Sequence, residues 1–176
     1  MRILGALIAG GRSRRFGSDK ALADWNGKSL VSHAAEALAQ QCEDVVVCGG
    51  CLAGFRSLED RPRAGLGPLG GLNAALHLAD RTGLRGALCV PVDVHPLPFD
   101  LRGNLVGTAP CVLREQRTVG WWPASLAAQL DEHLAAGHRS FLSWIEATDA
   151  QMLDDSAFAL INVNRPHDMA ALRRRR

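Results

Sequence analysis

The stretch from residue 3 to residue 20, ILGALIAGGRSRRFGSDK, constrains the chain more than any other. Its aliphatic residues predict a buried strand that stops at Gly10-Gly11. A glycine pair lets the backbone turn tightly and bring its N–H groups close to a ligand. Three arginines and a lysine, ending at Lys20, follow the pair. Backbone donors next to cations suit the phosphates of a nucleoside triphosphate, so we expect a nucleotide-binding loop here.

The glycine spacing of this loop fits neither of the two common nucleotide fingerprints. No glycines are spaced as G-x-G-x-x-G, the pattern of dinucleotide-binding turns. A Walker A loop needs four residues between its glycines, whereas Gly11 and Gly17 enclose five, and the lysine comes three residues later. The sequence therefore gives little support to hydride transfer or to P-loop hydrolysis.

Length and composition predict one cytoplasmic domain over residues 1–176. Hydrophobic residues make up 47% of the 176, enough for a sizeable core, and the formal charge of +2 is too small to argue for nucleic-acid binding. The N-terminal apolar run is too short for a signal peptide, and no stretch reaches the length of a membrane span. Five cysteines, an odd number, favour a reducing compartment over a disulfide framework.

The spacing of Cys48 and Cys51 as C-x-x-C leaves two interpretations open. It occurs in redox motifs and in half of a zinc site, but no second ligand pair accompanies it. The default interpretation is a glycine-rich exit from a strand, where an α/β sheet places ligand-binding loops.

The rest of the chain predicts alternating strands and helices. Asn26-Gly27 predicts a hairpin turn, and Ser29 caps a helix that runs to about residue 41. Near-continuous apolar strands predict a mostly parallel sheet with helices on both faces, which is a three-layer, Rossmann-like α/β fold. We expect further strands at 44–48, 86–93, 109–113, 118–121 and 158–163, and helices at 72–79, 123–136, 140–147 and after Pro166.

The strand at 86–93 ends in a carboxylate, Asp93. The carboxyl ends of parallel strands form the ligand crevice, so Gly10 and Asp93 should lie near each other. A lone aspartate after a strand is often only a turn residue, but a bound triphosphate needs a divalent cation, so we expect Asp93 to bind Mg²⁺. Before that strand, the glycine-rich residues 65–71 open the helix predicted at 72–79. They provide either an anion site or close packing of helix on strand.

Four segments in order resemble the molybdenum cofactor guanylyltransferases, a family of the sugar-nucleotide-transferase-like superfamily. The first is the loop, which is similar to L-A-G-G-x-S-x-R-M-G-x-D-K; the others are G-P-L-G-G at 67–71, the strand ending in Asp93, and N-V-N-R-P-H-D at 162–168. The resemblance implies that the chain transfers GMP from GTP to molybdopterin, releases pyrophosphate and depends on Mg²⁺.

The resemblance also implies site residues. Catalytic roles would fall to Lys20, Arg14 and Asp93, nucleotide binding to Ile8, Ala9, Gly10, Gly11, Lys20, Asp60 and Asp93, and acceptor binding to Asn162 and Asn164. Plain alternatives stay open: Ile8 and Ala9 as ordinary strand residues, Asp60 as a surface acid, and the asparagines as caps of the last helix.

The chain departs from the family's pattern in places that bear on its substrates. Cys48 stands where the family often has an asparagine that touches the nucleotide, and V-D-V-H-P at 92–96 replaces the usual C-D-x-P. Two alternatives therefore remain. One is a related transferase that uses CTP or another phosphorylated acceptor; the other is a catalytically silent nucleotide-binding partner of the proteins that mature molybdoenzymes.

Overall fold

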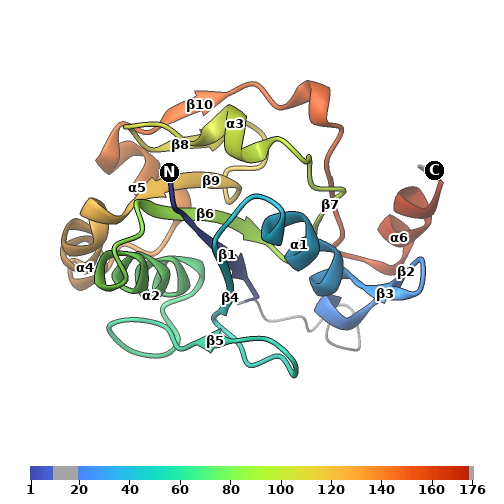
Figure 1. The fold of residues 1–176 in the computed structure, drawn as a ribbon, viewed down its shortest axis with the longest axis horizontal. Helices are drawn as coiled ribbons and strands as arrows, with labels where there is room; N and C mark the ends of the chain where they lie inside the picture. Colours follow the sequence, from blue (N-terminus) through green and yellow to red (C-terminus); the bar gives the residue numbers. More distant parts are fainter. Residues whose placement is uncertain (10–19, 175–176) are drawn as a thin grey trace.

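The computed structural model of the protein describes residues 1–9 and 20–174 and is built around one large twisted sheet (Figure 1). In the described part of the chain this sheet has seven strands in the order β10-β8-β9-β6-β1-β4-β5. The strands are β1 (Leu4–Ile8), β4 (Asp44–Cys48), β5 (Ser57–Leu58), β6 (Gly86–Pro91), β8 (Cys111–Leu113), β9 (Gly120–Pro123) and β10 (Gln151–Leu153). Only β9 runs antiparallel to its neighbours, β6 and β8, so the predicted mostly parallel sheet is confirmed.

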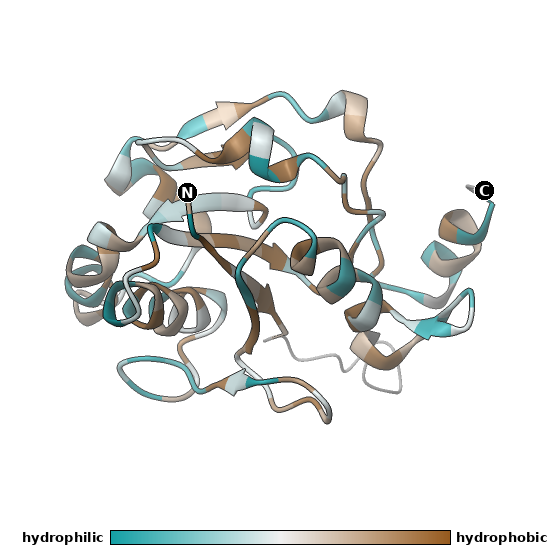
Figure 2. Cartoon of the chain, viewed as in Figure 1, coloured by the Kyte–Doolittle hydropathy of each residue, from teal (hydrophilic) through white to brown (hydrophobic). Residues whose placement is uncertain are grey.

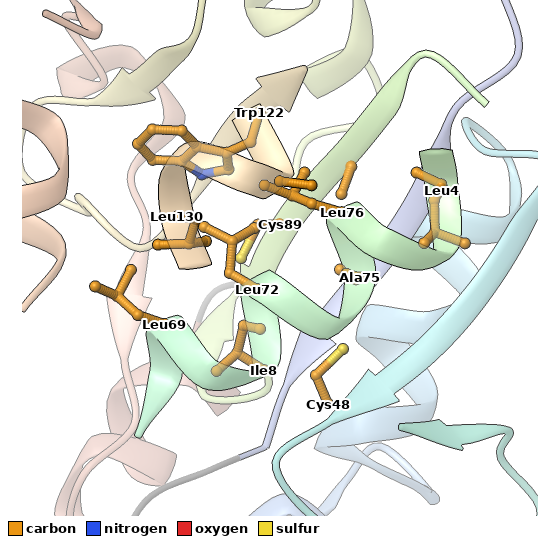
Figure 3. Close-up of a cluster of buried hydrophobic side chains, with 14 of the residues drawn as sticks. Leu4, Ile8, Cys48, Leu69, Leu72, Ala75, Leu76, Cys89, Trp122 and Leu130 are labelled. Carbon is orange, nitrogen blue, oxygen red and sulfur yellow. The ribbon is translucent and has the colours of Figure 1, made fainter. Parts of the chain in front are cut away.

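Helices cover both faces of the sheet because alternate strand residues point in opposite directions. Leu4, Ala6 and Ile8 of β1 pack with α2 (Pro68–Arg81), α4 (Ala127–Ala135) and α5 (Phe141–Thr148). Ile3 and Leu7 pack on the other side with α1 (Leu30–Ala39) and α3 (Leu101–Leu105). Figure 2 shows hydrophobic residues gathered on the central strands, and Figure 3 shows the core between the sheet and α2. The predicted three-layer fold is therefore present.

The predicted hairpin turn at Asn26-Gly27 and the predicted helix cap at Ser29 are also confirmed. Asn26 and Gly27 have φ values of 54° and 81°, the left-handed pair that a tight hairpin turn needs, and they join β2 (Asp24–Trp25) to β3 (Lys28–Ser29). Ser29 caps α1, its Oγ accepting a hydrogen bond from the Ser32 amide at 3.3 Å.

The start of α2 differs from the sequence-based prediction. Instead of beginning at Leu72, the helix begins at Pro68, directly after Gly67, whose φ of 71° turns the chain into it. Proline is favoured in a first helical turn because its missing N–H has no intrahelical partner to lose. The glycines at 70 and 71, which suggested a loop, lie inside the helix.

The segment predicted as a last strand, 158–163, is mostly irregular. Ser156–Phe158 form a 3₁₀ turn, Ala159 has a φ of 51°, and only β11 (Ile161–Asn162) is extended. It pairs antiparallel with β7 (Val94–His95), outside the main sheet, and leads into α6 (Pro166–Arg173). The predicted helix at 123–136 likewise opens as a 3₁₀ turn, Ala124–Leu126, before α4. Within residues 1–9 and 20–174, no helix has the length and apolar composition to cross a membrane.

Candidate nucleotide site

A pocket of about 500 Å³ opens at the carboxyl end of β4. Its wall is formed by the glycine-rich exit of β4, by β5 and by the segment that follows β5; the residues are Gly49, Gly50, Cys51, Ser57, Leu58, Glu59, Asp60, Ala64 and Gly65. A volume of this size is typical of small-molecule sites. The residues directly after Cys48, where a ligand-binding loop is predicted, thus line this pocket.

Among the predicted site residues that the structure describes, only Asp60 lies in the wall of this pocket. Its Oδ1 is buried and has no hydrogen-bond partner among the described residues. Burial raises the pKa of the Asp60 carboxyl above its ordinary value, although the backbone amides of Leu66 and Gly65 oppose the shift by hydrogen bonding. Asp60 as a whole is only partly buried, so this acidic residue borders the pocket although its Oδ1 is enclosed by the protein.

Two helical glycines let α2 pack closely against Asp60 and against β4. A Cβ on Gly70 would come within 3.0 Å of the Asp60 side chain, and a Cβ on Gly71 within 2.9 Å of the Cys48 Cβ. The amides of both glycines are directed to the Gly67 carbonyl, at 3.0 and 3.4 Å. The structure thus shows the close-packing role for this pair, one of the two roles that the sequence left open.

Ile8 and Ala9 connect the pocket to the neighbouring strand edge. Ile8 is 4% exposed, and its side chain packs in the core beneath α2 (Figure 3), as a plain strand residue does. Ala9 donates its amide to the Cys48 carbonyl at 2.9 Å and lies against Gly50 of the pocket wall. The pocket therefore borders the exit of β1, the point from which residues 10–19 continue.

Asp93 lies at the same edge of the sheet, two residues beyond the end of β6 rather than at its last residue. The pairing of β1 with β6 sets Ile8 opposite Pro91, and the Val92 amide donates to the Ile8 carbonyl at 3.2 Å. The Asp93 side chain is largely buried. Adjacent parallel strands thus place Asp93 beside the exit of β1, whereas Gly10, the residue predicted to lie near it, is outside the described residues.

The two asparagines of the last motif come to this edge through β11. Asn162 pairs with Val94, and the Val163 amide donates to the Asp93 carbonyl at 2.7 Å. The backbone amide of Asn164 is held by the Asp168 carboxylate at 2.8 Å at the start of α6. Asn162 is exposed next to the Asp93 turn, whereas Asn164 takes part in the cap of the last helix.

Several predicted residues cannot be placed. Gly10, Gly11 and Arg14 lie outside the described residues, and for Lys20 the structure describes only the backbone, at the start of a 3₁₀ turn.

The C-x-x-C pair does not form a site. Cys48 is buried in the core, and burial raises the pKa of its thiol to about 12, with the charge of Asp60 acting in the same direction. Cys51 is exposed in the pocket wall, and both thiols are free. Within the described ranges, no three His, Cys, Asp or Glu side chains gather in a way that could hold a metal ion. Cys48 therefore serves packing, which is the strand-exit interpretation.

Comparisons with known proteins agree with this geometry. Residues 5–152 match the profile of the family described as the MobA-like NTP transferase domain. The chain is 32% identical over 180 residues to the molybdenum cofactor guanylyltransferase of Rhodobacter capsulatus, covering 97% of this chain and 94% of that protein. A second relative of that name, from Cereibacter sphaeroides, is 33% identical over 188 residues, covering 97% and 95%.

Solved structures share the fold. Molybdopterin-guanine dinucleotide biosynthesis protein A of Archaeoglobus fulgidus has a TM-score of 0.75 at 17% identity, covering 97% of each chain. The CTP:phosphocholine cytidylyltransferase of Streptococcus pneumoniae has a TM-score of 0.68 at 15% identity, covering 99% of each. A Mycobacterium tuberculosis protein solved in complex with manganese has a TM-score of 0.62 at 12% identity over the whole of both chains.

The family match covers most of the chain, and the full-length relatives exceed 30% identity. The protein belongs to the family of MobA-like NTP transferase domains.

Proposed function

We propose that the protein is a guanylyltransferase that transfers GMP from GTP to the terminal phosphate of molybdopterin and releases pyrophosphate. The observation that carries this proposal is the pocket at the exit of β4, with Asp60 in its wall, beside the carboxyl edge of the sheet where Asp93 lies. Two full-length relatives are named molybdenum cofactor guanylyltransferases, which supports the choice of substrates.

Asp60 supports guanine as the base. The Watson–Crick edge of guanine presents two neighbouring donors, N1–H and the 2-amino group, and a carboxylate accepts from both. Cytosine and adenine present only an amino group on that edge. A carboxylate in the pocket wall therefore favours guanine, because it can accept from both of these donors.

Asp93 supports the binding of a divalent cation, Mg²⁺, at the carboxyl edge of the sheet. Mg²⁺ binds oxygen ligands and commonly takes one or two carboxylates, completing its shell from substrate phosphates and water. A single carboxylate at the ligand edge of the sheet fits that donor set. When bound there, the cation would neutralise charge on the triphosphate. A structural neighbour holds manganese, an ion of similar ligand preference.

The reaction needs alignment more than it needs a general base. An oxygen of the acceptor's phosphate attacks the α-phosphorus of GTP, and the bond from that phosphorus to the bridging oxygen of pyrophosphate breaks. The acceptor phosphate is already largely ionised at neutral pH, so no proton has to be removed first. Lys20 and Arg14, with Gly10 and Gly11, would bind the triphosphate and offset the charge of the departing pyrophosphate. Asn162, exposed beside the Asp93 turn, would bind the acceptor, with Asn164 next to it.

The unpaired cysteines suit a reducing cytoplasm, where the product would pass to proteins that mature molybdoenzymes.

Calorimetric titration with GTP, CTP and ATP, each with and without Mg²⁺, followed by an assay of pyrophosphate release, tests this proposal. We expect Mg²⁺-dependent preference for GTP and pyrophosphate release only when molybdopterin is also present. Preference for CTP would assign the chain to cytidylyl transfer. Binding of GTP without turnover would identify a catalytically silent partner.

A further inference from the structure

The turn after β6 carries Asp93 and also a histidine to which the proposed reaction gives no role. This turn belongs to V-D-V-H-P at 92–96, where the chain departs from the family's pattern. His95 is 1% exposed, and its Nε2 lies 3.0 Å from the Val92 carbonyl oxygen. A carbonyl oxygen only accepts, so the ring nitrogen donates the proton of this hydrogen bond. The side chain of His95 thus bonds back across the turn that contains Asp93.

This hydrogen bond holds one of the two peptide groups that flank Asp93. The Val92 carbonyl and the Asp93 amide belong to the same planar peptide group, so a bond to the carbonyl also orients the amide. The Asp93 carbonyl belongs to the next peptide group and accepts from the Val163 amide at 2.7 Å. Because both peptide planes are held, the two backbone dihedral angles of Asp93 are held with them. The direction in which its carboxylate leaves the backbone is therefore set partly by His95.

The donor is itself fixed from two directions. The backbone of His95 lies in β7, where it pairs with Ile161 of β11. Its ring lies against the Trp25 ring, with 5.8 Å between the centroids. Helix α1 supports Trp25 in turn: the His33 ring centroid is 4.5 Å from that of Trp25, and His33 Nε2 is 2.6 Å from the Trp25 carbonyl oxygen. The hydrogen bond to the Val92 carbonyl therefore comes from a ring whose position is set by packing.

Packing alone does not require a histidine at position 95. The neighbouring side chains of Val92, Val94 and Leu97 are aliphatic and belong to the core on this face of the sheet. A buried polar side chain costs free energy unless it is hydrogen-bonded, and an aliphatic residue would fill the space without that cost. A ring that donates to the peptide group before Asp93 does what an aliphatic side chain cannot, since it orients that group.

We propose that His95 is a positioning residue for Asp93, orienting its carboxylate through the Val92 carbonyl and so setting the affinity for Mg²⁺ in the nucleotide complex. This inference rests on the proposed function, in that it takes Asp93 as the ligand of Mg²⁺. His95 acts through the backbone and is not itself a metal ligand in this account. Groups that hold a metal ligand in place change metal affinity by about 10–100-fold when they are replaced.

The test is calorimetric titration of the full chain with GTP, once in EDTA and once with saturating Mg²⁺. His95→Met fills the space without a donor, whereas His95→Gln retains an amide that can donate to the Val92 carbonyl. We expect His95→Met to raise the Kd for GTP with Mg²⁺ by about tenfold but to leave the Kd in EDTA within about twofold of wild type. We expect His95→Gln to restore the Kd with Mg²⁺ to within about threefold of wild type.

His133→Met is the matched control. The ring of His133 is also hydrogen-bonded through Nε2, which lies 3.1 Å from Ser143 Oγ, and it lies 5.1 Å from the Trp144 ring. It belongs to α4, however, which is remote from β7 (Figure 1). The control therefore loses a packed, hydrogen-bonded histidine without any change at the Asp93 turn, and its Kd with Mg²⁺ should equal that of wild type.

A purely structural role of His95 predicts a different pattern. The melting temperature would fall, but the Kd of the folded molecules would be unchanged, or would rise equally in EDTA and in Mg²⁺, and either result would overturn the inference. So would a His95→Gln variant as weak as His95→Met, or an equal effect of His133→Met. If His95→Met does not fold, His95→Asn replaces it, because its shorter amide does not reach the Val92 carbonyl.

The wild-type titrations separate this inference from the proposed function. Mg²⁺-dependent binding of GTP by wild-type protein supports the proposed site whatever the His95 variants do. If wild-type protein prefers CTP, guanylyl transfer fails, and the same titrations with CTP decide the role of His95. If nucleotide binding by wild-type protein does not depend on Mg²⁺, the metal site at Asp93 fails and the inference fails with it.

Discussion

Replacing Asp60 with asparagine should weaken GTP binding and, at neutral pH, stabilise the folded protein. Asparagine retains an acceptor for the backbone amides of Gly65 and Leu66 but removes the buried charge. It also places an amide where a carboxylate would accept the donors of guanine. One substitution therefore separates what this side chain does for the ligand from what it costs the fold.

The magnitudes follow from the burial of the carboxylate. A hydrogen bond to a charged group contributes about 1.5–3 kcal/mol, so the Kd for GTP should rise by about tenfold or more. Removal of the partly desolvated charge should stabilise the fold by at most about 1 kcal/mol, because the residue is only partly buried and the amide that replaces one carboxylate oxygen is itself without a partner. For a chain of this length, that gain corresponds to a rise in Tm of at most about 2–4 °C.

The raised pKa of Asp60 fixes how stability and GTP affinity change with pH. The pKa of Asp60 is raised in the folded protein, so its favourable contribution to stability is complete below the unfolded-state pKa and is lost as pH rises through the folded-state pKa. The stability gain of Asp60→Asn should therefore be largest at neutral pH and disappear in acid. As the pH is lowered, the affinity of the wild-type protein for GTP should begin to fall at a pH above the pKa of an ordinary aspartate, because Asp60 is protonated there. The Asp60→Asn variant should not show this fall.

Calorimetric titration and thermal melts from acid to neutral pH measure both effects. Asp80→Asn is the matched control, since Asp80 is exposed on α2 away from the pocket. An Asp60→Asn variant with unchanged GTP affinity would refute the placement of the base at this carboxylate, whatever its Tm.

Other substitutions test the remaining parts of the site and its scaffold. Asp93→Asn should reduce turnover by at least about 100-fold and remove the Mg²⁺ dependence of GTP binding, because loss of a metal ligand costs several kcal/mol in the transition state; an unaltered Mg²⁺ titration would leave Asp93 as a turn residue. Gly71→Ala should destabilise the protein by about 1–3 kcal/mol in denaturant unfolding, since its Cβ would lie 2.9 Å from the Cys48 Cβ. Gly103→Ala, in open space on α3, should cost nothing, and equal effects would contradict the packing argument. Asp168→Ala should lower the Tm by about 2–4 °C through loss of the α6 cap, and an unchanged Tm would show that the cap is dispensable.

The sequence predicted the central strands because their patterns are local. β1 and β4 are continuous apolar runs bounded by glycines or charges, and such runs read as buried parallel strands. Their topology then placed Asp93 beside the exit of β1 without any side-chain information. The cap at Ser29 could also be predicted, because a serine directly before an apolar helical pattern commonly accepts a hydrogen bond from an amide three residues later, as Ser29 does.

Elements that depend on distant contacts could not be predicted in this way. Gly70 and Gly71 disfavour a helix by propensity, yet they lie inside α2 because tertiary packing against Asp60 and Cys48 demands small residues there. The pairing of β11 with β7 joins segments far apart in the chain.

The hydrogen bond from Asn73 of α2 to Asp131 of α4 could not be predicted for the same reason. This carboxylate lies 58 residues from its hydrogen-bond partner Asn73, and neither residue belongs to a motif. Nothing local in the sequence marks the pair as neighbours.

The central claim is guanylyl transfer, and the fate of the phosphates tests it most directly. The protein is incubated with molybdopterin, Mg²⁺ and GTP that carries a radioactive label on either the α- or the γ-phosphate. The account predicts that the α-label appears in the molybdopterin product and that the γ-label is recovered in pyrophosphate. A γ-label in the acceptor, or its release as inorganic phosphate without pyrophosphate, would contradict it.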